Sequence, residues 1–473
     1  MGPAPGTMFN PLNVTVVGGG YVGLVSAACL AAKGHFVRVL DVRPSVVAMI
    51  NRGVPTIHEV GLPPLLADVV GRGQLTAAEA SSAAIGDADI VLLCVGTPAR
   101  DGAIDLEQIR DAASMAGRWL RGHRRFASVV VKSTVVPGTT DTVVRGLLER
   151  ESGLSLAAQQ FGLGMNPEFL REGDAVSDFM CPDRLVFGHD DQRTLELLRC
   201  LYKPWDCDKI AVNTRTAEMI KYANNSLLAL QISAVNELSN VAAAIGGIDF
   251  MDVGRGIAAD KRWNPWDQAG RRVSPAILSY LVPGCGFGGS CFPKDVEALR
   301  TLAASVGVAP RILQAVLDVN ATQPIAVLGP FLDLLGDTVK RPAVLILGLA
   351  FKPGTDDVRE SASLRIARYL AARGIRVFAH DPIAGNNAVA ELGPSVVEIV
   401  SDWSTALADV DGVIVATGWP EYQSLASNPS RLDGKVLLDA RRLFPPDAFP
   451  NARHVMVGHA PRKQAVERRK ASA

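Results

Sequence analysis

No uninterrupted apolar run in this 473-residue sequence is long enough to cross a membrane. The longest apolar runs, such as AVLILGLAF at 343–351, fall well short of the ~18 residues that a spanning helix needs. The charges also cancel, with 48 Lys and Arg against 48 Asp and Glu, so neither a nucleic acid nor an anionic membrane is expected as a partner. The Pro- and Gly-rich start lacks the basic and apolar segments of a signal peptide, and we therefore expect a cytoplasmic protein.

Cysteine is scarce and has no pattern. The seven cysteines are an odd number without a repeated spacing, which argues against a disulfide framework and against a zinc site. No metal is therefore expected, and each thiol is a small apolar side chain unless its surroundings indicate otherwise.

What the sequence does contain is enough apolar residues, 48%, to fill more than one core, and its length suggests two or three domains. From Asn13 an apolar strand, a glycine turn, a helix of small residues and a second strand ending at Asp41 form one βαβ unit. Further strand-like runs follow as far as Phe169. Strands that alternate with helices predict a parallel sheet covered on both faces.

The pattern changes after residue 212. Residues 215–246 run for about eight turns without an internal Gly or Pro, and their apolar residues recur at helical spacing, which predicts a long, mostly buried helix. A second βαβ set begins after Lys340. We therefore predict an α/β fold in which two Rossmann-like parallel-sheet domains, at 1–212 and 326–473, are joined by the long central helix and a helical connector domain at 213–325.

A glycine-rich turn follows the first strand. Gly18, Gly20 and Gly23 fit G-x-G-x-x-G, and Asp41 stands at the end of the next strand. The glycines would let the backbone approach a pyrophosphate at a helix N-terminus, while Asp41 would accept from ribose hydroxyls and repel a 2′-phosphate. The turn predicts NAD in preference to NADP, although Arg43 favours the opposite. A tight turn without a ligand is the alternative interpretation.

The corresponding turn of the second half is GLAFKPG at 348–354. It has no dinucleotide fingerprint and instead contains Lys352, with Arg359 close behind. This change predicts a different phosphate-bearing ligand. Taken alone, Lys352 could equally be a surface lysine near a helix start.

The segment PGCGFGGSCFPKDVEAL at 283–299 places four glycines around two cysteines. Cys291 precedes Pro293, a favoured first-turn residue, so its sulfur is expected near a helix N-terminus with Lys294 close by, and both features would stabilise a thiolate. The glycines would leave space for a carbonyl carbon, and Asp295 would share the helical face of Cys291. Cys285 lacks these neighbours. Read alone, a single cysteine is more often core filler.

Several motifs occur together in one order, namely GGGYVGL at 18–24, VGTP at 95–98, VKSTVVPGT at 131–139, NPEFLREG at 166–173, KYANN at 221–225, NE at 236–237, GFGGSCFPKD at 286–295 and FKPGTDDVRES at 351–361. In these motifs the chain resembles the UDP-glucose/GDP-mannose dehydrogenase family over nearly its whole length. The GFGGSCFPKD form is more similar to the UDP-glucose branch than to the UDP-N-acetylmannosamine branch.

The resemblance implies a homo-oligomeric enzyme, dimeric or larger, that uses NAD to oxidise the C6 hydroxyl of a nucleotide hexose to a carboxylate. It also implies NAD binding by the first domain, dimerisation by the second and nucleotide-sugar binding by the third. A cysteine is needed because an aldehyde has no hydride to donate until a nucleophile adds to its carbonyl. The Cys291 thiolate would give a thiohemiacetal, whose oxidation yields a thioester that water hydrolyses.

Individual roles follow from the family's motifs. The implied catalytic residues are Cys291, Lys221, Asn225, Asp295, Glu168 and Thr134. Residues implied to contact the cofactor are Gly18, Gly20, Tyr21, Val22, Gly23, Asp41, Arg43, Thr97, Thr134, Glu172, Lys294 and Arg359. Residues implied to contact the substrate are Phe169, Leu170, Arg171, Lys221, Asn225, Arg262, Gly288, Phe351, Lys352 and Arg441.

Spacing adds two expectations to these roles. Lys221 and Asn225 share a face of the long helix and could stabilise an oxyanion, and Glu168 and Glu172 would share a helical face likewise. Without the other motifs, Lys221 would be interpreted as a lysine snorkelling from a buried helix, and the segment from Asn166 as a helix cap.

Two departures from the family pattern leave the base and the sugar open. The connection between Arg262 and Leu281 is longer than usual where a neighbouring subunit often supplies an arginine, and Arg262, Arg271 and Arg272 are all candidates. DARR at 439–442 replaces a DGRN-like run. The substrate is therefore expected to be UDP-glucose or dTDP-glucose, with GDP-mannose 6-dehydrogenase and a dinucleotide-binding sensor without turnover as the alternatives.

Overall fold

The computed structural model describes residues 10–100, 102–336 and 342–460. It divides into two compact units, one formed by residues up to 224 together with 301–307 and the other by residues 225–300 together with those from 308 onward. Most of the Pro- and Gly-rich start and the basic C-terminal tail lie outside the described residues.

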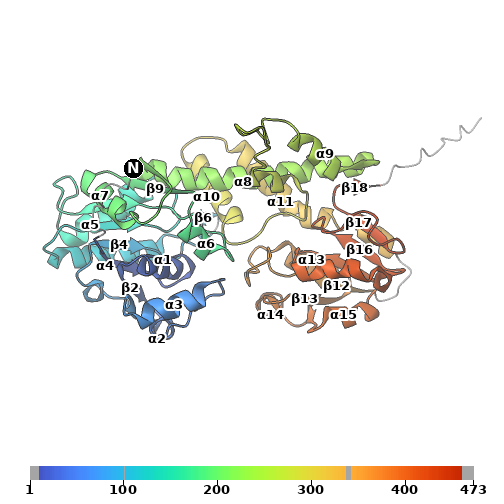
Figure 1. The fold of residues 1–473 in the computed structure, drawn as a ribbon, viewed down its shortest axis with the longest axis horizontal. Helices are drawn as coiled ribbons and strands as arrows, with labels where there is room; N and C mark the ends of the chain where they lie inside the picture. The colour runs from blue at the N-terminus through green and yellow to red at the C-terminus, as the bar shows by residue number, and fades with distance from the viewer. Residues whose placement is uncertain (1–9, 101, 337–341, 461–473) are drawn as a thin grey trace, which may run out of the picture. The chain divides into compact units, whose positions relative to one another are not determined.

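The first unit is built on an eight-stranded sheet with the order β10-β9-β8-β7-β4-β1-β2-β3 (Figure 1). All neighbouring strands are parallel except β8 and β9. The chain reverses direction in the sheet order between β1 and β4, which makes a switch point at the carboxyl ends of these strands. The strands are β1 (Asn13–Val17), β2 (Phe36–Asp41), β3 (Leu75–Glu79), β4 (Ile90–Leu93), β7 (Ser128–Val131), β8 (Gly162–Met165), β9 (Arg184–His189) and β10 (Asp208–Val212).

Both faces of this sheet are covered, because alternate residues of each strand point to opposite sides. Ile90 and Leu92 belong to a core shared with α1, α3, α6 and α7, whereas Val91 and Leu93 belong to a core shared with α4 and α5. The helices and short elements are α1 (Tyr21–Ala32), α2 (Pro44–Asn51), α3 (Leu62–Gly71), η1 (Ala83–Ile85), β5 (Ala99–Arg100), β6 (Ala103–Ile104), α4 (Glu107–Gly122), the π-helical turn η2 (Thr139–Val144), α5 (Arg145–Ser152), α6 (Ala175–Met180) and α7 (Gln192–Leu201).

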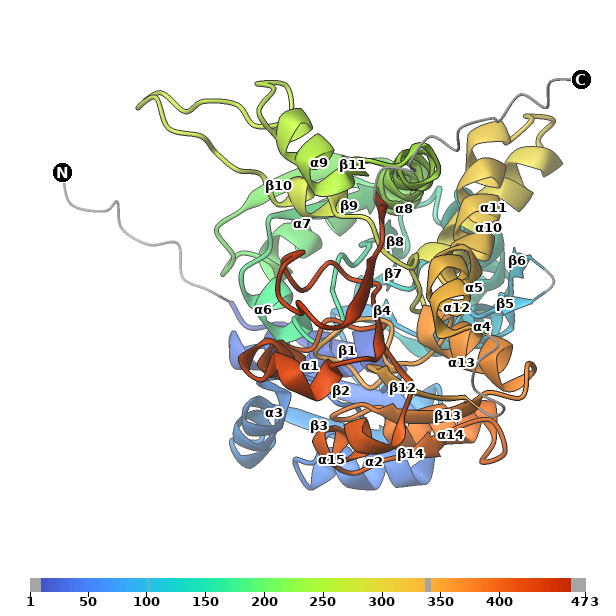
Figure 2. The same cartoon turned by 90° about the vertical axis from the view of Figure 1, so that its right-hand side faces the viewer.

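The long helix predicted from the sequence is present as α8 (Thr214–Ile245), which begins in the first unit and ends in the second. The expectation that it is mostly buried is wrong, because only 33% of its most apolar stretch is buried. After α9 (Phe250–Ala258) the chain runs out as an extended arm before the 3-10 turn η3 (Ala276–Leu281) (Figure 2). The remaining helical elements of this region are α10 (Phe292–Ser305), α11 (Arg311–Ala326) and α12 (Gly329–Leu335).

The second unit contains another eight-stranded sheet, with the order β11-β18-β17-β16-β15-β12-β13-β14. From β14 to β17 its strands are parallel, and β18 pairs antiparallel with both β17 and β11. This part repeats the switch-point order of the first sheet, now between β12 and β15. The strands are β11 (Ile248–Asp249), β12 (Ala343–Leu347), β13 (Arg376–His380), β14 (Glu398–Ile399), β15 (Gly412–Val415), β16 (Val436–Asp439), β17 (Arg453–Met456) and β18 (His459–Ala460).

Helices cover this sheet on both sides as well. Figure 2 shows α12, α13 and α14 on one side and α15 on the other, in agreement with the two separate cores to which Ile346 and Leu345 belong. The predicted pair of Rossmann-like sheets and the long central helix are thus confirmed. The covering elements are α13 (Ala362–Ala371), α14 (Gly385–Leu392), α15 (Trp403–Ala406), η4 (Leu407–Asp409), η5 (Pro420–Ser427) and η6 (Pro429–Leu432).

By length and composition alone, two helical stretches of the described residues could cross a membrane, namely Thr214–Ile245 and Arg311–Leu335. The core helices of soluble proteins pass the same test, so the finding is weak evidence for a membrane segment. Glu218, Lys221 and Asn236 are buried on α8, as expected for a core helix that makes polar contacts inside the protein.

Candidate functional site

The glycine turn after β1 has the geometry of an anion-binding turn. Gly18 has a φ of +105°, and a Cβ on Gly23 would lie 1.8 Å from the Gly18 carbonyl oxygen, so neither position accepts a side chain. A Cβ on Gly20 would instead meet no atom within 4 Å. Gly20 is the N-cap of α1 and no side chain caps it, which leaves the first N–H groups of the helix facing open space.

Asp41 ends β2 beside this turn. Its Oδ2 accepts from the Gly19 N–H at 2.9 Å, and its Oδ1 accepts from the backbone N–H and the guanidinium of Arg43 at 2.9 and 3.1 Å. Burial opposes the charge of Asp41, but the hydrogen bonds from Arg43 and Gly19 outweigh it and hold the pKa of the carboxyl below its usual value. An ionised acceptor therefore stands where the ribose of a dinucleotide lies in such folds. The turn and Asp41 together fit NAD.

Thr97 and Thr134 follow β4 and β7, the next strands across the sheet, and the Thr97 hydroxyl donates to the Thr134 carbonyl oxygen at 2.8 Å. Tyr21 lies at the first position of α1, and its hydroxyl contacts the buried carboxylate of Glu59, which also accepts from the Gly173 and Ala175 N–H groups. The cofactor residues expected in the first unit thus lie at the carboxyl edge of one sheet.

Glu168 and Lys221 form a buried ion pair in the first unit. Lys221 Nζ lies 2.8 Å from Glu168 Oε1, and the exposed fractions of the two side chains are 4% and 7%. The other oxygen of Glu168 accepts from the Leu170 N–H at 2.7 Å. Burial opposes the charge of Glu168, yet Lys221 more than compensates and the pKa of this carboxyl lies below its usual value.

The prediction that Glu168 and Glu172 share a helical face is wrong. Residues 166–171 are not helical, and the next helix, α6, begins at Ala175. The buried side chain of Asn166 holds this segment by accepting from Lys132 at 2.9 Å and donating to the Val186 carbonyl at the same distance. Phe169 has the guanidinium of Arg184 4.1 Å from its ring centroid, while Arg171 is exposed and paired with Asp178.

Cys291 directly precedes α10 in the second unit. The Asp295 N–H donates to the Cys291 carbonyl at 2.8 Å, so the helical bonding pattern begins at this cysteine, as its neighbours in sequence predicted. Its side chain is partly exposed and lies 3.6 Å from the Ser290 hydroxyl, whereas Cys285 is fully buried. Only Cys291 of these two has both a helix N-terminus and solvent access.

Asp295 lies one turn into α10 and is 1% exposed. Its Oδ2 accepts from the side-chain amide of Asn225 at 2.7 Å, and its Oδ1 from Lys294 Nζ at 2.8 Å. Asp295 thus follows Cys291 by one turn, as expected, and its contact with Asn225 of α8 is a further link that the spacing did not indicate. Lys294, which was expected beside the sulfur, forms an ion pair with Asp295.

The glycines around Cys291 make room for another part of the chain. A Cβ on Gly288 would lie 2.4 Å from the Glu360 carbonyl oxygen, and one on Gly289 would lie 2.9 Å from the Phe351 ring. The Gly289 N–H also donates to the Arg359 carbonyl at 2.8 Å. The absence of side-chain bulk thus lets the cysteine loop pack on the segment 351–361, which differs from the expectation that it leaves space for a carbonyl carbon.

Lys352 and Phe351 lie in this segment, which is not helical. The next helix, α13, begins only at Ala362, so Lys352 is not a lysine at a helix start. Arg359 is exposed and paired with Asp357 at 2.8 Å. Arg441, which follows β16, donates to the Ala416 carbonyl at 2.6 Å and lies 3.4 Å from the Gly286 carbonyl oxygen of the cysteine loop.

The unusual residue Arg442 is also accounted for. It has a φ of +54°, its Nη2 donates to both carboxylate oxygens of Asp249 at 2.8 and 2.9 Å, and its side chain is 3% exposed. The pair ties the turn after β16 to β11 at the end of α8. Arginine therefore replaces the asparagine of the family pattern with an ion pair that holds the strained backbone.

The arm after α9 holds the three arginines that the sequence left as alternatives. Arg262 is exposed and paired with Asp260, and Arg271 is exposed and paired with Asp267. Arg272 lies with its guanidinium 4.3 Å from the Trp266 ring centroid and donates to the Ala259 carbonyl. Which of the three contacts a substrate stays a prediction.

Models of three domains match the chain. They describe the NAD binding domain of the UDP-glucose/GDP-mannose dehydrogenase family at residues 12–206, the central domain at 215–322 and the UDP binding domain at 345–446. The chain belongs to the UDP-glucose/GDP-mannose dehydrogenase family. The UDP-glucose 6-dehydrogenase AglM of Haloferax volcanii is 37% identical over 440 residues, which cover 91% of this chain and 97% of the relative. TuaD of Bacillus subtilis, also named a UDP-glucose 6-dehydrogenase, is 36% identical over 434 residues, 91% and 89% of the two chains.

A solved structure agrees with these sequence matches. The UDP-glucose dehydrogenase of Pyrobaculum islandicum has a TM-score of 0.86 at 39% identity and covers 97% of this chain and 100% of its own. As a family member the protein is an NAD-dependent oxidoreductase that acts on a nucleotide sugar.

Sequence reasoning missed two groups that support the site. Lys132 lies in the VKST motif, and no feature of the local sequence assigns it a role. It is 2% exposed, and burial lowers its pKa to about 8. Asp381 stands after β13, where Asp41 stands in the first half, and the equivalence of the two βαβ sets could have singled it out.

Proposed function

We propose that the protein is a UDP-glucose 6-dehydrogenase that converts the C6 alcohol to a carboxylate in two successive oxidations. The observation that carries this proposal is Cys291 at the N-terminus of α10, beside the buried Asn225–Asp295–Lys294 network. Relatives named for this activity match over about nine tenths of the chain, which supports UDP-glucose over other nucleotide hexoses.

Cys291 captures the half-oxidised sugar. Its sulfur adds to the aldehyde carbonyl and gives a tetrahedral thiohemiacetal carbon, whose existing hydrogen can leave as hydride while the oxygen re-forms a carbonyl. NAD, when bound at the turn from Gly18 to Gly23, supplies the hydride acceptor for each oxidation. Water then cleaves the thioester that remains on Cys291 and frees the thiol.

Glu168 acts as the base that takes a proton from this water. Lys221 keeps it ionised, and the ionised carboxylate is the form that can accept a proton. Lys221 and Asn225 donate to the oxygen that becomes negative when sulfur or water adds to the carbonyl. Asp295, fixed by two donors, holds or moves a proton, and Thr134 orients the reacting hydroxyl.

A screen of NADH formation over UDP-, dTDP- and GDP-hexoses tests the proposed substrate. Oxidation of UDP-glucose with the highest kcat/KM is the expected result. A higher kcat/KM for dTDP-glucose or GDP-mannose would mean that the proposed substrate is wrong but that the proposed reaction class is right. NAD binding without NADH formation from any of these sugars would refute the enzyme activity in favour of a sensor.

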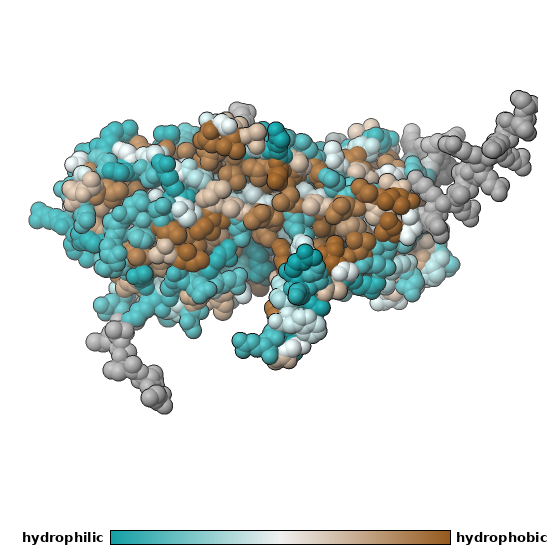
Figure 3. All heavy atoms as spheres, turned by 90° about the horizontal axis from the view of Figure 1, so that it is seen from above, coloured by the Kyte–Doolittle hydropathy of each residue, from teal (hydrophilic) through white to brown (hydrophobic). Residues whose placement is uncertain are grey.

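We also propose that two copies associate through α8. Leu227, Leu238, Val241 and Ile245 are each more than half exposed and lie three, four or eleven residues apart, so they share one face of the helix. Figure 3 shows apolar side chains gathered on the face of the molecule over α8. A large apolar face of this kind is typical of an interface. Light scattering should find a dimer or larger oligomer, and Val241→Asp should shift it to a monomer.

The cytoplasm remains the proposed location. All seven cysteines are free, including the exposed Cys181, which suits a reducing compartment. Fractionation of the source cells, with activity followed in soluble and membrane fractions, tests this.

A further inference from the structure

Asp381 occupies in the second half the position that Asp41 occupies in the first. The Gly348 N–H donates to the His380 carbonyl at 2.8 Å, just as the Gly18 N–H donates to the Leu40 carbonyl at 2.7 Å. Each glycine directly follows the first strand of its βαβ set, and each aspartate directly follows the acceptor residue. The two turns are therefore equivalent in the fold, although only the first has the dinucleotide fingerprint.

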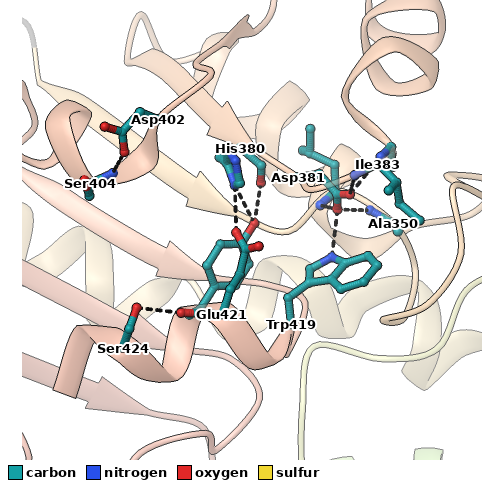
Figure 4. A network of polar contacts seen from close by, with 12 residues as sticks. Ala350, His380, Asp381, Ile383, Asp402, Ser404, Trp419, Glu421 and Ser424 are labelled. Atoms are coloured by element: carbon teal, nitrogen blue, oxygen red, sulfur yellow. Dashed lines mark hydrogen bonds and ion pairs between the residues drawn. The ribbon is translucent and has the colours of Figure 1, made fainter. Parts of the chain in front are cut away.

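The carboxylate of Asp381 is fully occupied by the protein (Figure 4). Its Oδ2 accepts from the Leu349 N–H at 2.7 Å, the Ala350 N–H at 3.0 Å and the Trp419 indole at 3.0 Å. Its Oδ1 accepts from the Ala384 N–H at 2.8 Å and the Ile383 N–H at 3.1 Å. Five donors exceed the roughly four lone-pair directions of a carboxylate, so none is left for a ribose hydroxyl.

Asp381 therefore stabilises the turn through hydrogen bonds and does not bind a cofactor. The Thr417 hydroxyl donates to the Ala350 carbonyl at 2.6 Å and the Ser363 hydroxyl to the Leu349 carbonyl at 2.9 Å, so both peptides of the turn are held on both sides. Phe351 and Lys352 are the residues that follow directly. Their backbone direction is thus set by the contacts of Asp381.

The braced turn also supports the cysteine loop. The Phe351 ring lies 2.9 Å from the position that a Cβ on Gly289 would take, and the Gly289 N–H donates to the Arg359 carbonyl of the same segment. A movement of Phe351 would therefore displace the loop that leads to Cys291. The Asp381 residue itself is only 7% exposed, so it supports the turn from the buried side.

We propose that Asp381 is a positioning residue for the nucleotide sugar, which sets Lys352 and the cysteine loop through the N–H groups of Leu349 and Ala350 and through Trp419. The inference rests on the proposed function, since it takes the second half as the nucleotide-binding half. It goes beyond that function in naming the group that converts a dinucleotide-type turn into one for a different ligand.

Asp381→Asn is the first test, because its amide group would face the donors that the carboxylate now accepts. The affinity for UDP, measured by calorimetry, and the KM for UDP-glucose should worsen by about tenfold or more, while the affinity for NAD stays unchanged. Asp402→Asn is the matched control. Asp402 lies in the same half and accepts from the Ser404 N–H at 2.8 Å as a helix cap, a role that Asn also fills.

Unchanged UDP affinity in a folded Asp381→Asn protein would overturn the inference. If that variant does not fold, Trp419→Phe provides the test, because it removes only one of the five donors to Asp381. A severalfold loss of UDP affinity is then expected, and an unchanged affinity would contradict the inference. A wild-type protein that binds neither UDP nor UDP-glucose would refute the proposed function and the inference together. Wild-type binding with equal binding by the variants would refute the inference alone.

Discussion

The side-chain amide of Asn225 donates a 2.7 Å hydrogen bond to Oδ2 of Asp295, and both side chains are buried. Lys294 occupies the other oxygen of the same carboxylate. Asp295 is therefore fixed in direction one turn after Cys291, which is the arrangement expected of a group that handles a proton during chemistry at that sulfur.

Asp295→Asn should lower kcat by about 10²-fold or more, because the amide cannot accept from both Asn225 and Lys294 and cannot carry the proton. The affinity for NAD should not change. Glu297→Gln on the same helix is the control, since Glu297 pairs only with the partly exposed Arg300 in the contacts described. Steady-state NADH formation measures both, and a kcat within twofold of wild type for Asp295→Asn would contradict the role.

Cys291→Ala should abolish formation of the carboxylate while the first oxidation remains chemically feasible. The number of NADH molecules per sugar should then fall from two to at most one, with aldehyde as the product. Cys285→Ala is the control, because Cys285 is fully buried and its loss should lower thermal stability slightly without changing that ratio. Carboxylate formation by Cys291→Ala at the wild-type rate would show that another nucleophile serves.

Glu168→Gln should slow hydrolysis more than oxidation. The amide that replaces the carboxylate can still accept a hydrogen bond from Lys221, but it cannot take a proton from water. The thioester should therefore accumulate, and NADH should form in a burst of about two molecules per active site, followed by slow formation. Stopped-flow absorbance measures the burst. A uniform slowing without a burst would place Glu168 before thioester formation.

Asp41→Ser should weaken the preference of the enzyme for NAD over NADP. The change removes the negative charge that would repel a 2′-phosphate, while Arg43 is released from its ion pair and can contact that phosphate. The ratio of kcat/KM values for the two cofactors should fall by about tenfold or more. A ratio that does not move would mean that Asp41 is not beside the ribose.

Lys132 should make stability depend on pH in the alkaline range. Its pKa of about 8 in the folded protein lies below the ordinary lysine pKa of 10.5, so the folded state carries fewer protons than the unfolded state between these values and gains stability as pH rises from 8 to 10.5. Below pH 8 the burial penalty is fully present. Lys132→Met removes it, so the melting temperature of the variant relative to wild type should be higher at pH 7 than at pH 10. Parallel pH profiles of the two proteins would contradict this.

Local sequence was sufficient for features that depend on near neighbours. Pro293 and the polar residues after it indicated a helix starting at Cys291, and the Asp295 N–H to Cys291 carbonyl bond confirms it. The glycine fingerprint and Asp41 likewise indicated the first turn. These features depend on backbone preferences and strand order, which can be recognised directly in the sequence.

Features that depend on distant contacts could not be predicted in this way. Asn166 and Pro167 suggested a helix containing Glu168, but contacts of Asn166 with Lys132 and Val186 hold the segment extended. The bulk-free loop before Cys291 fits against Phe351, some sixty residues later, and the donors to Asp381 come from three separate segments. Tertiary packing decided each of these.

The central claim is that the thiol of Cys291 carries the sugar between the two oxidations. Mass spectrometry of the Cys291 peptide, from Glu168→Gln protein quenched during turnover with UDP-glucose, tests it most directly. A sugar-nucleotide adduct on Cys291 that disappears in Cys291→Ala is the predicted result. Turnover without any adduct on this peptide would contradict the claim.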